Sequence, residues 1–512
     1  MPTLRLTQTQ TSPDQDTYQV QVEFERGGRR RTANARFAFS LTPQEHEHLR
    51  WYLEDYLEYP HDPAPTIAAR IEKNMQEVGA RLFEAVFETN KDTLKLWNRA
   101  MDDLDAVRLE IATDVAGATS LPWEFLFDPD TESYLALQAH TFVRTHTSST
   151  REPDDVPAGG GGPIRILLVI CRPSGRADVP FRSVAVRIIK GLSESARQAF
   201  QLEVLRPPTF ERLAKALRDA RSREQPYHIV HFDGHGSFLD VEKLYQEWRG
   251  KTFEEMMARL EELIALDPRR FSPELVYPRP RRPDERGYLV FENPESQYNL
   301  RLVDGPELGA LLKENDVPVL VLNACRSAHA EAPKAPESVD ADPHTQVRAF
   351  GSLAQEIMDE GVAGVVAMRY NVYVVTAAQF VADLYAALAQ GHPLGQAVTL
   401  GRKQLHAQPL RAIAYEPMPL QDWPVPVVYE AAPIALFPAP AQETGLHIHL
   451  EAGDAAPRRG ALDPGLPPQP DAGFYGRDET LLALDRAFDA QRVVLLHAYA
   501  GSGKTATAAE FA

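Results

Sequence analysis

The chain has 512 residues, of which 44% are apolar and 25% are charged, a composition typical of a soluble globular protein with about three domains. Its formal net charge of −18 argues against nucleic acid or an anionic membrane as the main partner, because both require basic surfaces. It has two cysteines, too few for a disulfide framework, and no apolar run of signal-peptide or membrane-spanning length. We therefore expect a soluble cytoplasmic protein without nucleic-acid or membrane partners.

Residues 1–150 are expected to form an α/β region that carries no catalytic constellation. Strict alternation in Tyr18–Phe24 and in Ala33–Phe39, around a Gly-Gly turn, predicts a β-hairpin with one solvated face. Thr42-Pro-Gln-Glu45 predicts the start of a helix, with a Thr cap, a Pro in the first position and a Glu three residues on. We interpret this region as structural or regulatory.

The main sheet is expected to begin after a linker with four consecutive glycines, residues 151–163. Ile164–Cys171 is apolar except for Arg165, as is typical of a strand buried on both faces, and Cys171 is expected to be an inert core side chain. Tyr227–Phe232 predicts a second buried strand. Asp233-Gly-His-Gly236 follows it and predicts a glycine-rich loop that carries a histidine.

A third buried strand is predicted from Val317 to Leu322, and Cys325 follows it within three residues. Strand and helix patterns then alternate as far as Val425–Tyr429, which we expect at a sheet edge because it contains a proline. This alternation predicts an α/β fold with a central, mostly parallel sheet that helices cover on both faces.

The carboxyl ends of parallel strands meet at one edge of a sheet. The strands Tyr227–Phe232 and Val317–Leu322 would therefore bring His235 and Cys325 together as a cysteine–histidine dyad. His235 would lower the thiol pKa or accept the thiol proton, and later protonate the leaving amine. The backbone amides of Gly236 and Cys325 would form an oxyanion hole. Asp233 is a candidate to orient His235.

Four further residues have candidate roles in or near this site. His231 and Asn323 are expected to support the loops that carry the dyad, and Arg326 is expected to shape the loop after the nucleophile. Asp178, shortly after the first strand, is a candidate for a pocket that accepts a basic residue before the scissile bond.

A metal site is the alternative for the histidine segment. His231, Asp233 and His235 alternate and could face one side as ligands of a metallohydrolase. No further His, Asp or Glu cluster is evident close by, and the glycines around His235 suit a loop better than a ligand face. We therefore expect no metal in the site, and no cofactor for the peptidase reaction.

A different motif lies at the end of the chain. Arg492–His497 predicts a strand, and the next residues, AYAGSGKT, form a phosphate-loop pattern before a helix start. In this pattern Gly501 and Gly503 let backbone amides face phosphates, Lys504 reaches the outer phosphates and Thr505 holds Mg²⁺. Because the sequence stops seven residues later, we expect a fragment of a longer protein. The complete domain would bind ATP and Mg²⁺, and this stub would not.

These patterns divide the chain into expected units. They are an N-terminal α/β region (1–150), a glycine-rich linker (151–163), a main domain (164–439) with a charged insertion (240–286), a Pro/Ala/Gly-rich linker (440–473) and the start of a P-loop domain (474–512).

Three stretches carry a family resemblance: His231-Phe-Asp-Gly-His-Gly236, Leu322-Asn-Ala-Cys-Arg-Ser327 and Leu121-Pro-Trp-Glu-Phe-Leu-Phe-Asp128. Together they resemble the CHAT domain, whose members are caspase-like cysteine peptidases related to separase, over about residues 100–435. The resemblance implies a caspase-like three-layer αβα sandwich, preceded by a smaller region similar to a non-catalytic caspase-like half. It also implies that His235 is the catalytic histidine and Cys325 the nucleophile.

Phe474-Tyr-Gly-Arg-Asp478, with the phosphate loop, is similar to the start of STAND-type NTPases. The two resemblances imply a cysteine endopeptidase with a protein substrate, as the effector part of a bacterial NTPase-regulated signalling or defence protein that self-associates through the full NTPase. The alternative is a catalytically silent caspase-like module that binds or scaffolds a partner under NTPase control. The presence of both His235 and Cys325 favours the peptidase.

Overall fold

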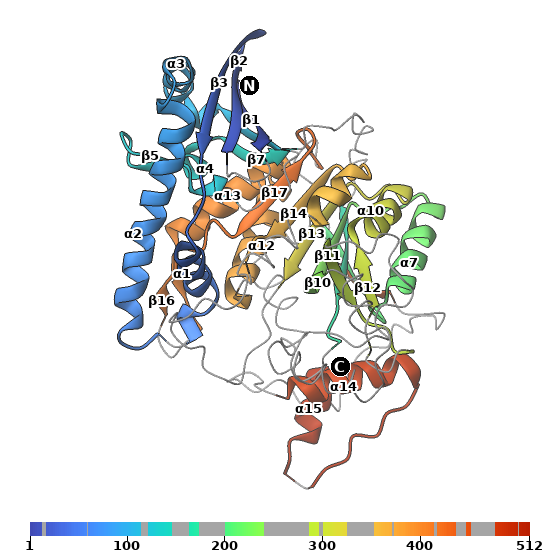
Figure 1. Cartoon of the computed structure of the whole chain (residues 1–512). Helices are drawn as coiled ribbons and strands as arrows, with labels where there is room; N and C mark the ends of the chain where they lie inside the picture. Colours follow the sequence, from blue (N-terminus) through green and yellow to red (C-terminus); the bar gives the residue numbers. More distant parts are fainter. Residues whose placement is uncertain are drawn as a thin grey trace, which may run out of the picture.

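The computed structural model describes residues 1–12, 17–58, 60–113, 121–145, 163–173, 200–239, 286–295, 299, 301–324, 353–370, 373–413, 417–436, 447–451, 477–499 and 501–511. The sheet elements in this part of the chain form one 14-stranded, mainly parallel sheet and two short two-stranded ribbons (Figure 1). Among these residues no helix has both the length and the apolar character needed to cross a membrane.

The main path of the large sheet, in spatial order, is β18 (His447–Glu451), β9 (Phe200–Leu205), β8 (Ile164–Ile170), β10 (Ile229–Leu239), β13 (Val319–Ala324), β14 (Gly364–Met368), β17 (Pro426–Glu430), β7 (Thr141–Thr145), β4 (Arg108–Thr113), β1 (Thr3–Ser12), β2 (Thr17–Arg26) and β3 (Arg29–Ala38). β11 (Arg286–Phe291) and β12 (Arg301–Asp304) branch from β10. The ribbons are β5 (Phe127–Asp128) with β6 (Ser133–Tyr134), and β15 (Leu410–Arg411) with β16 (Met418–Pro419).

The α-helices are α1 (Pro43–Glu54), α2 (Ala64–Phe83), α3 (Lys91–Met101), α4 (Leu135–Gln138), α7 (Phe210–Ser222), α10 (Gly305–Glu314), α12 (Val374–Ala389), α13 (Leu394–Ala407), α14 (Asp478–Ala490) and α15 (Lys504–Phe511), and residues 353–359 are also helical. Short 3₁₀ turns cover Tyr56–Glu58, Leu104–Ala106 and Trp123–Phe125, and α2 continues into a π-helical turn, Glu84–Glu88.

Helices cover both faces of the sheet, and two apolar cores result. Successive residues of β8 point to opposite faces, so Leu168 belongs to the core under α12 and α13, whereas Val169 belongs to the core under α7 and α10. The prediction of a mixed α/β fold with a mainly parallel, doubly covered sheet is therefore confirmed. The first core also includes the side chains of β1, β2, β4 and β7, so the packing is continuous from the N-terminal strands onward.

Several elements form where the sequence places them. β2 and β3 are the predicted hairpin. At the start of α1, Thr42 accepts a hydrogen bond from the Glu45 amide while the Glu45 carboxylate accepts one from the Thr42 amide, which is the predicted capping box. Among the strands of the large sheet, β1, β7, β9 and β18 were not predicted; β18 lies in the segment expected to be a linker.

The predicted edge position of the last strand is wrong. β17 lies inside the sheet, antiparallel to β14 and parallel to β7. The proline does not disrupt this position because Pro426 is the first residue of the strand, opposite Met368, where a missing amide removes little of the ladder. β17 thus joins the N-terminal strands to the rest of the sheet.

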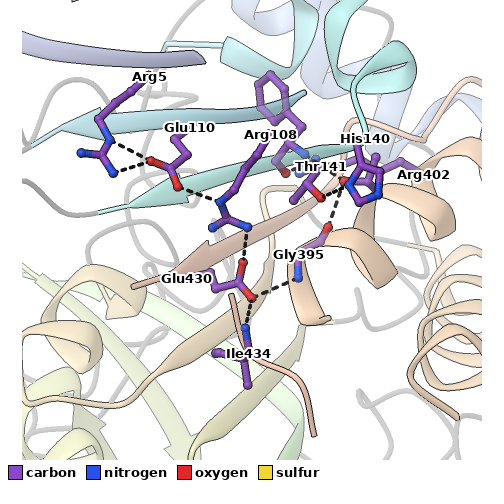
Figure 2. A network of polar contacts seen from close by, with 11 residues as sticks. Arg5, Arg108, Glu110, His140, Thr141, Gly395, Arg402, Glu430 and Ile434 are labelled. Carbon is purple, nitrogen blue, oxygen red and sulfur yellow. Dashed lines mark hydrogen bonds and ion pairs between the residues drawn. The ribbon is translucent and has the colours of Figure 1, made fainter. Parts of the chain in front are cut away.

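A buried network of charged groups lies across this junction (Figure 2). Arg108 of β4 donates to Glu110 at 2.7 Å and to Glu430 of β17 at 2.9 Å, and Arg5 of β1 donates to Glu110 at 2.7 Å. Glu430 also accepts hydrogen bonds from the amides of Gly395 and Ile434. Burial raises the pKa of the Glu430 carboxyl, and the Arg108 guanidinium opposes that effect. These paired charges hold β1, β4 and β17 in register.

Candidate functional site at the carboxyl ends of three strands

The predicted site lies where β8 and β13 end on either side of β10. Asp233 of β10 pairs with Ile170 of β8 on one side and with Asn323 of β13 on the other, and Gly234 pairs with Ala324. All three strands are parallel, so their carboxyl ends share one edge of the sheet. Residues near the ends of three neighbouring strands therefore gather at that edge.

The histidine segment is a strand rather than the predicted loop. β10 continues through Asp233–Gly236 as far as Leu239, and beyond the parallel sheet it pairs with β11, so that His235 lies opposite Val290 and Gly236 opposite Leu289. The prediction failed because the glycines were interpreted as turn residues, whereas Gly234 pairs with β13, and Gly236 pairs with β11, far along the sequence. His235 is half-buried in this extension.

Gly234 fills a place that has no room for a side chain. A Cβ atom there would lie 2.8 Å from the Phe232 ring and 3.2 Å from the Cβ atom of Cys171. Glycine thus lets β10 pass closely over the end of β8 immediately before His235.

Asp233 is completely buried, and Arg172 compensates its charge. The guanidinium of Arg172 donates to the Asp233 carboxylate at 2.9 Å and to the backbone carbonyl oxygens of Asp233, at 3.0 Å, and of Cys171, at 2.8 Å. The Arg172 amide in turn donates to the buried carboxylate of Glu292 at 2.8 Å. A buried carboxylate is stable only with such partners.

His231 lies deeper in the same strand and contacts α12. Its Nδ1 atom is 2.7 Å from the hydroxyl oxygen of Tyr385, and burial lowers its pKa to about 3. The ring is therefore neutral near pH 7 and packs as a core side chain.

The metal alternative finds no support in this part of the chain. His231 bonds to Tyr385 and Asp233 to Arg172, which are partners of structural side chains rather than of ligands. Among the described residues no group of three metal-ligating side chains lies close together.

Cys171 directly follows β8 and is a fully buried thiol whose Sγ atom lies 3.3 Å from the carbonyl oxygen of Pro208. Burial raises its pKa well above the ordinary range, so Cys171 is a poor nucleophile. The other cysteine, Cys325, lies outside the described residues, as do Arg326 and Asp178. In sequence, Cys325 directly follows Ala324, the residue that pairs with Gly234.

Sequence reasoning missed Arg172 and Glu292. Both are buried at strand ends, and neither was given a role from the sequence. The one available signal was indirect: an aspartate predicted at the end of a buried strand needs a cation, and Arg172 follows the neighbouring predicted strand.

The phosphate-loop residues occupy a turn before α15. Gly501 and Gly503 have positive φ angles of 76° and 80°, which favour glycine, and α15 begins at Lys504. The Lys504 ammonium donates to the carbonyl oxygens of Ala498 and Tyr499, at 2.9 and 2.8 Å. Thr505 is exposed at the start of the helix.

The strand predicted immediately before the phosphate loop is absent. Residues 493–499 form no regular element, and Val493 and Leu495 are 85% and 88% exposed. Among the described residues no strand pairs with this segment, and an isolated apolar strand without neighbours gains no ladder of hydrogen bonds.

The fold and the site together define an α/β protein whose candidate functional groups gather at the carboxyl edge of a mainly parallel sheet. The sequence model of the CHAT domain matches residues 76–437. The chain therefore belongs to the CHAT domain family. The matched range begins inside α2 and includes β4 and β7, so it extends into the N-terminal region.

Among solved structures, the chain is similar to a chain of the separase–securin complex of Saccharomyces cerevisiae, with a TM-score of 0.37 and 12% identity over 88% of this chain. This chain covers 30% of the length of that one. The comparison with curated proteins gave no match.

Proposed function

We propose that the chain is a cysteine endopeptidase in which Cys325 is the nucleophile and His235 the general base. The observation that carries the proposal is the register of β10 and β13. Gly234 pairs with Ala324, and these two residues directly precede His235 and Cys325 in the sequence. Consecutive Cα atoms are about 3.8 Å apart and neighbouring strands about 4.8 Å, spacings that are compatible with the proposed dyad.

The reaction follows from these roles. His235 accepts the Cys325 proton, and the thiolate attacks the carbonyl carbon of a peptide bond. The amides of Gly236 and Cys325 stabilise the negative oxygen of the tetrahedral intermediate. The protonated His235 then gives its proton to the leaving amine, which breaks the C–N bond and leaves a thioester. Water, deprotonated by His235, hydrolyses the thioester and regenerates the thiol.

Substrate choice is proposed to involve Asp178 in a pocket for a basic residue before the scissile bond. Arg326 is proposed to shape the loop that follows the nucleophile, and Asn323, which is buried at the end of β13, to support that loop.

The nucleotide role is a second part of the proposal. In the complete protein, the loop of Gly501 and Gly503 would hold phosphates, Lys504 would exchange its two carbonyl partners for phosphate oxygens, and Thr505 would contact Mg²⁺. The support is the pair of positive-φ glycines directly before a helix. ATP would then drive self-association of a bacterial signalling or defence protein, with the peptidase as its effector.

Covalent capture tests the peptidase. A panel of peptidyl acyloxymethyl ketones, with basic, acidic or apolar residues before the ketone, is incubated with the protein and its intact mass is measured. We expect one adduct per chain that is lost in Cys325→Ala and in His235→Gln and retained in Cys171→Ala, the matched control. Failure of every probe to label the wild-type protein, with nucleotide and Mg²⁺ added to the longest available chain, would favour the binding module instead.

A further inference from the structure

We propose that Arg172 is a positioning residue for His235, and that the docking of α14 on the sheet edge holds Arg172 in place. This inference rests on the proposed function and adds the element that regulates the site. Its starting point is that α14 belongs to the tail of the chain, far from the strands in sequence, yet its polar contacts fall on residues around the candidate site.

α14 contacts residues that follow three strands. Asp485 forms an ion pair with Arg206, directly after β9, at 2.9 Å. Arg486 donates to the carbonyl oxygen of Arg172, after β8, and forms an ion pair with Glu292, after β11, at 3.5 Å. These strand ends lie at the edge where β10 carries His235.

The contact also has apolar and backbone support. Leu481 and Leu482 of α14 are buried in the core that includes α12 and β8. β18, which precedes α14 in the chain, pairs in parallel with β9, and Glu451 lies opposite Leu205, next to Arg206. The tail is therefore held by a strand, by a helix and by ion pairs that are mostly shielded from water.

A series of polar contacts leads from α14 to Asp233, which lies two residues before His235. Glu292 is shared between Arg486 and the amide of Arg172, and the Arg172 side chain binds both the carboxylate and the carbonyl oxygen of Asp233. Asp233 is two residues before His235 on the same strand and faces the same side. Among the described residues, the groups that interact with the Asp233 carboxylate include the Arg172 guanidinium, which binds it, and the Cys171 thiol.

The planar guanidinium of Arg172 has several donors, so it can bind the backbone and the side chain of Asp233 at the same time. A single positive charge without this geometry would not hold the backbone of β10 in the same way. It donates to the Asp233 carbonyl and to the Asp233 carboxylate at once. Lysine keeps the charge but lacks this planar pair of donors. Withdrawal of α14 would leave the Arg172 carbonyl and Glu292 without Arg486, and the end of β10 would lose its fixed position relative to β13.

The test measures the reactivity of Cys325 as a function of pH rather than peptide cleavage. Alkylation by iodoacetamide is followed by intact mass, with the buried Cys171 replaced by alanine. In the parent protein we expect a pH profile shifted to low pH by His235, since the thiolate is the reactive form. A shift of about one pKa unit changes the thiolate fraction about tenfold below the pKa. His235→Gln should remove the shift.

Asp485→Arg should move the profile toward that of His235→Gln, and the charge swap Asp485→Arg with Arg206→Asp should restore the parent profile. Arg172→Lys should also move the profile toward that of His235→Gln, although it keeps the positive charge. The matched control is Asp103→Arg, which breaks an exposed ion pair with Arg26 in the N-terminal half and should change nothing. Because Asp485 is partly exposed, these variants test the proposal even if substitution of Arg172 prevents folding.

The outcomes separate the two proposals. If His235→Gln leaves the profile unchanged, the dyad itself is wrong. If His235→Gln shifts the profile but Asp485→Arg and Arg172→Lys do not, the dyad stands and the positioning role of Arg172 and α14 is overturned.

Discussion

At the scale of single residues, a buried carboxylate and three arginines form a charge cluster in the described core. Glu124 accepts hydrogen bonds from Arg144 at 3.0 and 2.7 Å and from Arg369 at 3.4 Å, and Arg402 lies 3.8 Å away. Burial alone would raise the pKa of Glu124, but the arginines lower it to about 2. Glu124 thus stays charged in the folded protein.

We predict that Glu124→Gln destabilises the protein by about 3–5 kcal/mol, because the substitution leaves buried guanidinium groups without their counter-charge. The measurement is urea unfolding at pH 7. Glu77→Gln, at an exposed ion pair with Lys73 on α2, is the control and should change the free energy of unfolding by less than about 1 kcal/mol. Equal effects of the two substitutions would contradict this account.

The same carboxylate makes a predicted contribution to acid stability. Its pKa is lower in the folded protein than in the unfolded chain, so the stabilisation is complete above the unfolded pKa of about 4.5 and is lost as the pH falls toward 2. Unfolding of the wild-type protein between pH 5 and 2 should therefore show a steeper pH dependence than that of Glu124→Gln. Parallel curves for both proteins would show that Glu124 does not titrate in this range.

Gly234 provides a residue-scale prediction next to the candidate site. Gly234→Ala should destabilise the protein and weaken any Cys325 reactivity, because the new Cβ atom would lie 2.8 Å from the Phe232 ring. Phe232→Leu removes the ring atoms that clash, so Gly234→Ala should cost less in that background. A double-mutant cycle of unfolding free energies checks this; strictly additive effects would mean that the close contact is not the cause.

At the scale of elements, local signals predicted helix starts well. The Thr42 capping box was readable because all its parts lie within four residues of sequence. We predict that Thr42→Ala costs about 1 kcal/mol of stability, and that Thr42→Ser, which keeps the hydroxyl, costs much less. Thermal unfolding of the two variants measures the difference, and equal losses would show that the hydroxyl is not the stabilising group.

Elements that depend on distant partners were predicted poorly. The strand character of His235 and Gly236 comes from β11, about fifty residues later in the sequence. β1 is rich in Thr and Gln, and its strand is fixed by β2 on one side and β4 on the other. For the apolar segment before the phosphate loop, a strand was predicted but none forms. An apolar pattern does not form a strand without a neighbouring strand to pair with.

At the scale of the whole molecule, the N-terminal strands are part of the same sheet as the candidate site. β17 pairs with β7, and the Arg108–Glu430 ion pair is buried across this junction (Figure 2). The order of strands could not be predicted from the sequence, because the pattern of each buried strand is the same whichever neighbours it has. The family residues indicated the site, but its buried supports, Arg172 and Glu292, became visible only in the fold.

We predict that a chain beginning at residue 147 folds poorly. It would lack β7 and β4, expose β17 as an apolar edge and leave Glu430 without Arg108. Size-exclusion chromatography and thermal unfolding, compared with the full chain, should show aggregation or a lower Tm. A soluble monomer with the Tm of the full chain would mean that the two parts are independent domains.

The central claim is that Cys325 and His235 cleave proteins. The most direct measurement is a survey of new N-termini by mass spectrometry after a bacterial lysate is incubated with the wild-type protein, Cys325→Ala or Cys171→Ala, with ATP and Mg²⁺ present. The account predicts discrete termini with the wild-type protein and with Cys171→Ala, and none with Cys325→Ala. Identical sets of termini for the wild-type protein and Cys325→Ala would contradict it.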